Sequence, residues 1–298
     1  MPDAELIDGQ IDLGGILLGP ETPVNIIDLG GLGRPPVRDG DVDQPSMDGA
    51  FAGLDYYASR QVQIDAAIKI PGDPEACEAF LATMIDAYDD QAVRLSGGVG
   101  IPLRIKRRGR PVKRLTGRVR RLDPEYGQVK HGYMPIDLEF VAQDPVFYAD
   151  TEMVTEIPLG WLTGGGFAAP VTAPIFVQDG AIAADRPGWV HNSGTGNAWP
   201  VIRVTGPCAT VTITNVETGR SLSLPTLDLD AAQWIEIDTR PGYRTVLDQN
   251  GGNVAMSPGS RIDLFSLPPG QSEMRWTAYD NTNTARLRLT WRDAYIAL

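Results

Sequence analysis

The chain has 298 residues, which is long for one hydrophobic core and favours two domains. Its hydrophobic content of 42% excludes a disordered chain, while 33 Gly and 24 Pro favour a turn-rich, mainly β architecture. A formal net charge of -12 argues against a nucleic-acid-binding protein, which normally carries a basic footprint.

Cysteines and apolar runs indicate where the chain resides. Cys77 and Cys208 lie far apart and do not suggest a disulfide scaffold, so we expect a reducing compartment. The N-terminal residues include three acids and no basic stretch followed by an apolar one, so we expect no signal peptide. The longest apolar run, around residues 167–177, is broken by Pro170 and Pro174, so we expect no membrane-spanning segment.

The first fifty residues predict short strands and then a loop. Strands are expected at Ile11–Leu13, Ile16–Leu18 and Val24–Leu29, separated by Gly-Pro and Gly-Gly breaks. Residues 33–53 are rich in Asp, Gly and Pro and are expected to form a loop.

Within this loop, Asp39, Asp41 and Asp43 have the carboxylate spacing with which a calcium loop begins. Gln44 stands where the sharp turn needs glycine, and Ala50 where a bidentate glutamate belongs. We therefore favour a solvated acidic loop over a metal site, and expect no cofactor or metal.

A strand and one helix follow. Val62, Ile64 and Ala66 alternate with polar residues within 56–70, which predicts a strand. Asp73 as cap and Pro74 at the first helical position open a helix. Its apolar stripe must pack on a sheet, and we favour this over a cofactor site. The stripe comprises Cys77, Phe80, Leu81, Met84, Ile85 and Tyr88.

A concentrated basic segment lies between Ile101 and Leu122. It holds ten of the 26 basic residues and no acid, so the rest of the chain carries -22. Apolar residues alternate with the charges and Gly109-Arg-Pro111 can form a turn, which predicts a two-stranded β-ribbon. Lys106 is one of the ten. The residues that we expect to contact another subunit or a partner are Arg104, Arg107, Arg108, Arg110, Lys113, Arg114, Arg118, Arg120 and Arg121.

Two alternatives remain for this segment. Nucleic acid is the usual partner of such a patch, but the rest of the chain repels phosphate, and no aromatic residues interleave with the arginines. A solvated ribbon that serves only solubility is the second alternative. We favour contact between subunits and expect no sequence-specific binding of nucleic acid.

The middle of the chain predicts a strand and then a connector. Ile136–Val141 alternates as a strand and is closed by Asp144-Pro-Val-Phe-Tyr148. Residues 151–190 are rich in Gly, Pro and Ala, with Gly164-Gly-Gly-Phe167 followed by Pro170 and Pro174, and are expected to connect two domains.

The last hundred residues predict a two-sheet β-sandwich. Ile235 and Ile237, and later Leu287 and Leu289, alternate with polar residues, and turns are expected at Asn250-Gly251 and Pro268-Pro-Gly270. Seven to eight short strands at regular spacing are typical of such a sandwich.

Specific sequence motifs in the C-terminal half of the chain resemble those of a known family. Asn192-Ser-Gly-Thr-Gly-Asn-Ala-Trp-Pro200, a Val/Ile-rich strand, Gly206-Pro207, a Thr-rich strand and Asn215-x-x-Thr-Gly219 are similar to the distal tail proteins of long-tailed, non-contractile bacteriophages. The Asp144–Tyr148 ending and the closing Leu289-x-Trp-Arg-Asp293 extend the resemblance, although Gln271 stands where relatives often have Asn.

This resemblance implies an organisation. It implies a mainly β, two-domain chain: residues 1–150 form a β-rich domain that makes a ring and carries one helix and the basic ribbon, residues 151–190 a connector, and residues 191–298 a galectin-like sandwich. It also implies a structural, non-enzymatic component of the virion tail tip, assembled in the host cytoplasm. Implied partners are five further copies in a homo-hexameric ring, the tail tube protein, a hub or tail-associated fibre protein and, as a further candidate, the tape measure protein.

Two other function classes stay open. A carbohydrate-binding module in host recognition would use exposed aromatics such as Trp189, Trp199 or Trp234. A glycan hydrolase needs a carboxylate pair that folding sets and spacing does not reveal. Catalytic motifs are otherwise missing from the sequence: His131 and His191 are the only histidines, and the dinucleotide-like Gly194-Thr-Gly196 lacks its third glycine.

Overall fold

A computed structural model describes residues 5–159, 188–280, 282 and 284–298 of the protein. The expected Gly-rich motif at Gly164–Phe167 lies outside these residues, together with most of the expected connector. The chain divides into two compact units: unit 1 contains residues 1–150 and 295–298, and unit 2 contains residues 151–294. Both are built mainly from antiparallel strands, which confirms the predicted β class.

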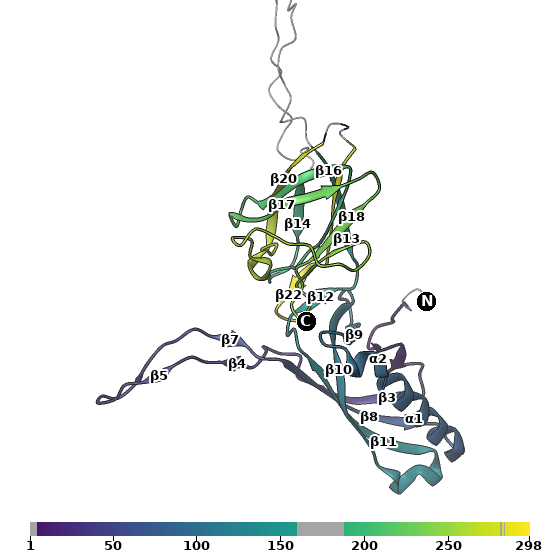
Figure 1. Cartoon of the computed structure of the whole chain (residues 1–298). Coiled ribbons are helices and arrows are strands. Elements are labelled where there is room, and N and C mark those ends of the chain that lie inside the picture. Colours follow the sequence, from purple (N-terminus) through teal and green to yellow (C-terminus); the bar gives the residue numbers. More distant parts are fainter. Residues whose placement is uncertain (1–4, 160–187, 281, 283) are drawn as a thin grey trace, which may run out of the picture. The chain divides into compact units, whose positions relative to one another are not determined.

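Unit 1 is built on a nine-stranded sheet (Figure 1). Seven strands follow the order β2-β1-β9-β10-β11-β8-β3, while β12 pairs with β10 and with β22. The strands are β1 (Ile11–Leu13), β2 (Ile16–Leu18), β3 (Val24–Gly30), β8 (Arg60–Lys69), β9 (Ile101–Ile105), β10 (Lys113–Pro124), β11 (Tyr133–Ala142), β12 (Phe147–Ala149) and β22 (Ala294–Tyr295).

The core of unit 1 arises from alternation on β8 and β11. Val62 and Ile64 of β8 are fully buried and stand opposite Phe140 and Leu138 of β11, so one face of each strand is apolar. Helix α1 (Pro74–Tyr88) buries Cys77, Leu81 and Met84 in the same core.

The predicted start of α1 is confirmed. Asp73 accepts a hydrogen bond from the Ala76 amide at 2.9 Å, and Pro74 occupies the first turn. Ile85, expected in the apolar stripe, is 45% exposed, because it lies at the edge of the buried face. Shorter helical segments in this unit are α2 (Gln91–Leu95) and the 3-10 helix η1 (Tyr126–His131).

The basic segment forms a hairpin that lies inside the sheet. Strands β9 and β10 pair in the register Lys113↔Ile105 to Gly117↔Ile101, which confirms the two-stranded arrangement. Strand β1 pairs with the other edge of β9 and β11 with the other edge of β10, so the hairpin is not a free-standing ribbon. Its basic side chains therefore emerge from the middle of a sheet.

The stretch that we expected to be a loop, residues 33–53, belongs to a long β-hairpin, here called the arm (residues 34–57) (Figure 1). Two short ladders hold it: β4 (Val37–Arg38) pairs with β7 (Tyr56–Tyr57), and β5 (Val42–Asp43) pairs with β6 (Ala50–Phe51). The expectation failed because ladders of two residues leave no alternation for the sequence to reveal.

Between the two ladders, the strands of the arm touch at glycines. A Cβ built on Gly53 would lie 2.0 Å from the carbonyl oxygen of Gly40, so no larger residue fits there. The Gly53 amide donates to Asp41 Oδ1 at 2.8 Å, which gives this aspartate a structural role inside the arm.

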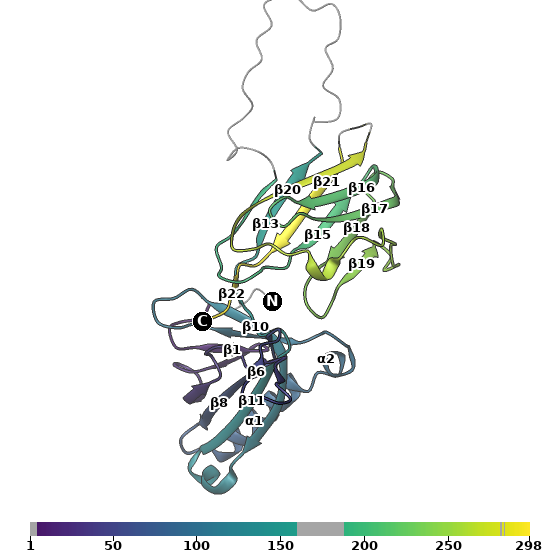
Figure 2. The same ribbon diagram turned by 90° about the vertical axis from the view of Figure 1, so that its left-hand side faces the viewer.

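Unit 2 is a two-sheet sandwich (Figure 2). The five-stranded sheet has the order β13-β21-β15-β18-β19 and the four-stranded sheet β14-β20-β16-β17. The strands are β13 (Met153–Pro158), β14 (Trp189–Asn192), β15 (Val201–Thr205), β16 (Cys208–Asn215), β17 (Arg220–Leu229), β18 (Trp234–Asp238), β19 (Thr245–Asp248), β20 (Gly270–Tyr279) and β21 (Arg286–Trp291), with the 3-10 helix η4 (Ile262–Leu264) between β19 and β20.

Two tryptophans tie the sheets of unit 2 together. Trp276 Nε1 on β20 donates to the Pro158 carbonyl oxygen on β13, and Trp291 Nε1 on β21 donates to the His191 carbonyl oxygen on β14, each at 3.2 Å. Strand β13 lies within residues 151–190, where we expected a connector, and pairs along its whole length with β21.

Replacement of Asp73 by alanine is expected to lower the free energy of unfolding by about 1 kcal/mol, because the first turn of α1 loses its side-chain acceptor. Chemical denaturation followed by circular dichroism measures this loss. Asp86→Ala is the matched control, since this exposed aspartate lies inside the same helix. Equal stability of Asp73→Ala and the control would contradict the capping role.

Candidate functional site

The basic residues predicted to contact a partner divide into those that the fold uses and those that it leaves free. Arg104 shows the first kind most clearly: its side chain is only 4% exposed. It donates to Asp12 Oδ2 at 2.9 Å and to both oxygens of Asp150 at 2.7 to 3.1 Å. Arg114 stands directly opposite on β10 and approaches Asp150 Oδ1 at 3.7 Å. Each buried charge in this cluster meets an opposite one, so removal of any single partner would leave an uncompensated charge in unit 1.

Lys113 and Arg110 bind the end of the chain. Lys113 Nζ donates to the Ala297 carbonyl oxygen at 3.0 Å and lies 3.9 Å from the centre of the Tyr295 ring. Arg110 Nη1 donates to the Leu298 carbonyl oxygen at 2.7 Å. Burial lowers the pKa of Lys113, and the Arg110 cation lowers it further. The hairpin thus binds the C-terminal residues 295–298 through their backbone carbonyl oxygens.

Arg118 and Arg121 are also engaged within unit 1. Arg118 donates to the carbonyl oxygens of Val99, Arg94 and Ser96 and so fixes the segment after α2. Arg121 forms ion pairs with Asp123 and Asp137.

Arg107, Arg108 and Arg120 remain. Each is exposed, and none of the three side chains has a hydrogen bond or ion pair within the part of the chain that the structure describes. Arg107 and Arg108 occupy the β9–β10 turn, whose shape is held by the Arg110 amide donating to the Arg107 carbonyl oxygen at 3.0 Å. A contact role for these three residues stays a prediction, and sequence alone did not separate them from the engaged ones.

The arm is a second candidate contact surface. Met47 is 75% exposed, Leu54 73% and Phe51 61%, and Val42, Tyr56 and Tyr57 are also exposed. A two-stranded ribbon is marginally stable by itself in water, and this one presents six large apolar side chains to solvent. Such a surface is typical of a segment that another protein covers.

Arg60 holds the base of the arm, and its side chain is fully buried. Its Nη1 donates to the carbonyl oxygens of Gly31 at 2.9 Å and Gly33 at 2.6 Å. Its Nε donates to the Pro145 carbonyl oxygen at 2.8 Å, and its Nη2 to that of Ile296 at 3.1 Å. Burial lowers the pKa of Arg60, and the four carbonyl oxygens compensate the charge together with the Phe147 ring, which lies 4.4 Å away.

The Asp144–Tyr148 motif presents one of these carbonyls. Asp144 accepts hydrogen bonds from the Val146 amide at 3.2 Å and from the Tyr148 hydroxyl at 2.6 Å, which closes a turn around Pro145. Burial raises the pKa of Asp144, and the two hydrogen bonds oppose that shift.

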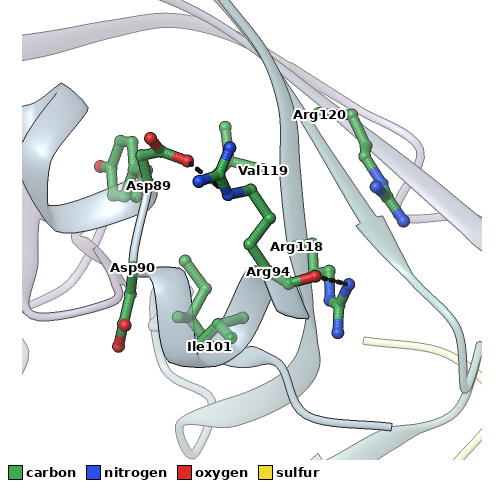
Figure 3. A pocket seen from close by; sticks show the side chains of 9 residues that line it. Asp89, Asp90, Arg94, Ile101, Arg118, Val119 and Arg120 are labelled. Carbon is green, nitrogen blue, oxygen red and sulfur yellow. Dashed lines mark hydrogen bonds and ion pairs between the residues drawn. The ribbon is translucent and has the colours of Figure 1, made fainter. Parts of the chain in front are cut away.

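A pocket of about 200 Å³ lies between the end of α1, α2 and β10 (Figure 3). Arg94 pairs with Asp89 at 3.5 Å beside it, and Arg118 and Arg120 line it. Burial raises the pKa of Tyr88 well above its usual value, and Asp12 raises it further. The described lining residues include no histidine, cysteine or serine.

The described residues contain no group of three His, Cys, Asp or Glu side chains that could hold a metal ion. The aspartates of the calcium-like sequence lie along the arm, where Asp41 is engaged by the Gly53 amide. Within the described ranges, no helix is long and apolar enough to cross a membrane.

The aromatic residues considered for sugar binding are partly covered. Trp234 stacks against Arg203, whose guanidinium carbon lies 4.1 Å from the ring centre, and that arginine pairs with Glu236 at 2.7 Å. The indole nitrogen of Trp189 is buried. Trp199 is only partly exposed. None of the three tryptophans is fully exposed.

Solved structures resemble this chain over nearly its full length. The Dit protein (gp 19.1) of phage SPP1, described as a paradigm of the hub adsorption apparatus in phages that infect Gram-positive hosts, matches 96% of this chain and 98% of its own with a TM-score of 0.61 and 14% identity. Two structures of the phage P2 baseplate in its activated conformation, with Ca and with Sr, match 94% of this chain and 96% of theirs with a TM-score of 0.49 and identities of 11% and 12%.

No protein-family model and no curated protein matches the sequence. At 14% identity the SPP1 match establishes the fold: the chain has the mainly β fold of that Dit protein, as the motifs at Asn192–Gly219 predicted.

Replacement of Arg60 by methionine is expected to lower the free energy of unfolding by about 2–4 kcal/mol, because four carbonyl oxygens lose their charged donor. Hydrogen exchange of the amides near residues 31–35 should accelerate. Denaturation curves and mass-resolved exchange measure both effects. Arg38→Met, an exposed arginine of the arm, is the control; similar behaviour of the two variants would rule out the bracing role of Arg60.

Proposed function

We propose that this protein is a structural component of the tip of a long, non-contractile phage tail, where copies of the chain form a ring. The near full-length fold match to the SPP1 Dit protein supports this proposal. The observation that carries it is the arm, since a braced hairpin with six exposed large apolar side chains needs a covering surface.

A second copy of the chain is the partner that we infer for the arm. The arm is fixed at its base by Arg60 and extends away from the sheet, so its apolar side chains are presented to a neighbour (Figure 1). Repetition of one such contact around an axis gives a closed assembly in which every arm is covered. The number of copies that we propose is six.

In this ring, unit 1 supplies the contacts between subunits. The ring joins the tail tube to the baseplate hub or tail fibre, and the tape measure protein is a further neighbour. The role is one of assembly and involves no catalysis. The acidic charge of the chain, -12, fits partners other than nucleic acid.

Native mass spectrometry of the purified chain is expected to give a species of six times the 32.2 kDa of one chain. A variant in which two glycines replace residues 35–56 should be monomeric yet retain its circular dichroism spectrum, because the sheet of unit 1 does not include the arm. A monomeric wild-type chain, or an arm-less variant with the wild-type mass, would contradict the proposal.

A finer test replaces the apolar side chains alone. The triple change of Met47, Phe51 and Leu54 to serine is expected to raise the dissociation constant of the oligomer at least ~100-fold, because three large apolar side chains no longer gain from burial. Light scattering over a concentration series measures it. Ile85→Ser changes an exposed apolar residue of α1 and should leave the mass distribution unchanged.

A further inference from the structure

We propose that the acidic outer part of the arm of one copy pairs with Arg107 and Arg108 in the β9–β10 turn of a second copy. This inference rests on the proposed function. It identifies the surface of the second copy that the arm contacts, which the ring proposal does not specify. Three observations carry it: an uncompensated acidic segment, an uncompensated basic turn, and a geometry that separates them within one chain.

The acidic segment is the arm from Asp39 to Asp55. It contains five aspartates and no basic residue, interleaved with the exposed apolar side chains. Asp41 accepts from the Gly53 amide, whereas Asp43 and Asp48 have no ion pair within the described part of the chain. The arm is therefore both apolar and negative along the length that a partner would cover, which favours a receptor that carries positive charge.

The basic turn meets this need. Arg107 and Arg108 are exposed and unpaired among the described residues, whereas the basic residues on either side are used by the fold. Lys106 Nζ donates to the Arg110 carbonyl oxygen at 2.8 Å, and Arg110 donates to the Leu298 carbonyl oxygen at 2.7 Å. The turn is thus fixed on both sides, and its two exposed guanidinium groups are of the type that recognises carboxylates in a planar, bidentate way.

Both features belong to unit 1, yet the outer arm does not reach the turn of its own copy. Extended strands rise about 3.3 Å per residue, so the segment from Gly33 to Asp43 spans roughly 30 Å away from the base that Arg60 holds. No ion pair joins the arm to the turn within the described residues. A second copy brings such a turn to an arm without bending either, and the opposite charges set the register of the apolar contact.

The test is a charge swap in the full-length chain. Asp43→Lys with Asp48→Lys, and separately Arg107→Glu with Arg108→Glu, are each expected to raise the dissociation constant of the oligomer at least tenfold at low salt. The chain that carries all four changes should recover most of the wild-type affinity, because the pairing is restored with reversed signs. Analytical ultracentrifugation over a concentration series gives the constants, and circular dichroism checks folding.

The matched control for the aspartate variant is Glu78→Lys with Asp86→Lys, which changes the net charge by the same amount on the exposed face of α1. It should leave the dissociation constant within twofold of wild type. A second measurement does not need the lysine variants to fold. Copies with Asp43→Cys are mixed with copies carrying Arg107→Cys, and a disulfide-linked heterodimer is expected under oxidising conditions.

The outcomes separate this inference from the proposed function. An oligomer whose affinity is unchanged in both charge variants, or that gives no heterodimer, overturns the pairing and leaves the ring standing. A monomeric wild-type chain overturns both. Loss of affinity in each charge variant with recovery in the combined chain supports the pairing, because a general effect of net charge would not be corrected by the swap.

Discussion

The arrangement of unit 1 depends on one buried cation. Arg60 lies at the first position of β8, in phase with Val62 and Ile64, so its side chain enters the core and would be costly there without partners. Four carbonyl oxygens and the Phe147 ring supply them. The carbonyl oxygens come from the base of the arm, from the turn after β11 and from the last residues of the chain. The cost of burying one charge is thereby offset by contacts that fix three distant segments.

The basic hairpin also contains cations that the fold uses, together with others that it leaves exposed. Arg104, Lys113 and Arg118 meet carboxylates or backbone carbonyls inside unit 1, so much of the positive charge of this segment serves folding. Burial makes such contacts strong, because water does not screen them. Arg107 and Arg108 lie in the turn of the hairpin, where their side chains do not pair with groups inside unit 1. A dense run of basic residues is therefore no measure of the charge that a partner meets.

The sequence predicted well those elements whose signal is local. Alternation placed β8 and β11, Asp73 and Pro74 placed the start of α1, and the motifs of the last hundred residues predicted the β fold that the SPP1 structure matches. The arm was not predicted from the sequence, because its ladders are only two residues long. Arg60 could have been noticed, since it continues the inward phase of β8, but its partners lie up to 236 positions away. Contacts at that separation are set by tertiary folding, which periodicity does not report.

The charge pattern of the arm also restricts the symmetry that copies of this chain can adopt. Two arms laid side by side would bring aspartates against aspartates, so an isologous dimer built from arm against arm is disfavoured. An arm that lies on another surface is either exchanged reciprocally between two copies or passed in one direction from each copy to the next. Contacts passed in one direction continue until the rotation closes on itself or an open helix grows. The charge pattern of a short hairpin, which sequence patterns overlook, thus limits the symmetry of any assembly that the arm builds.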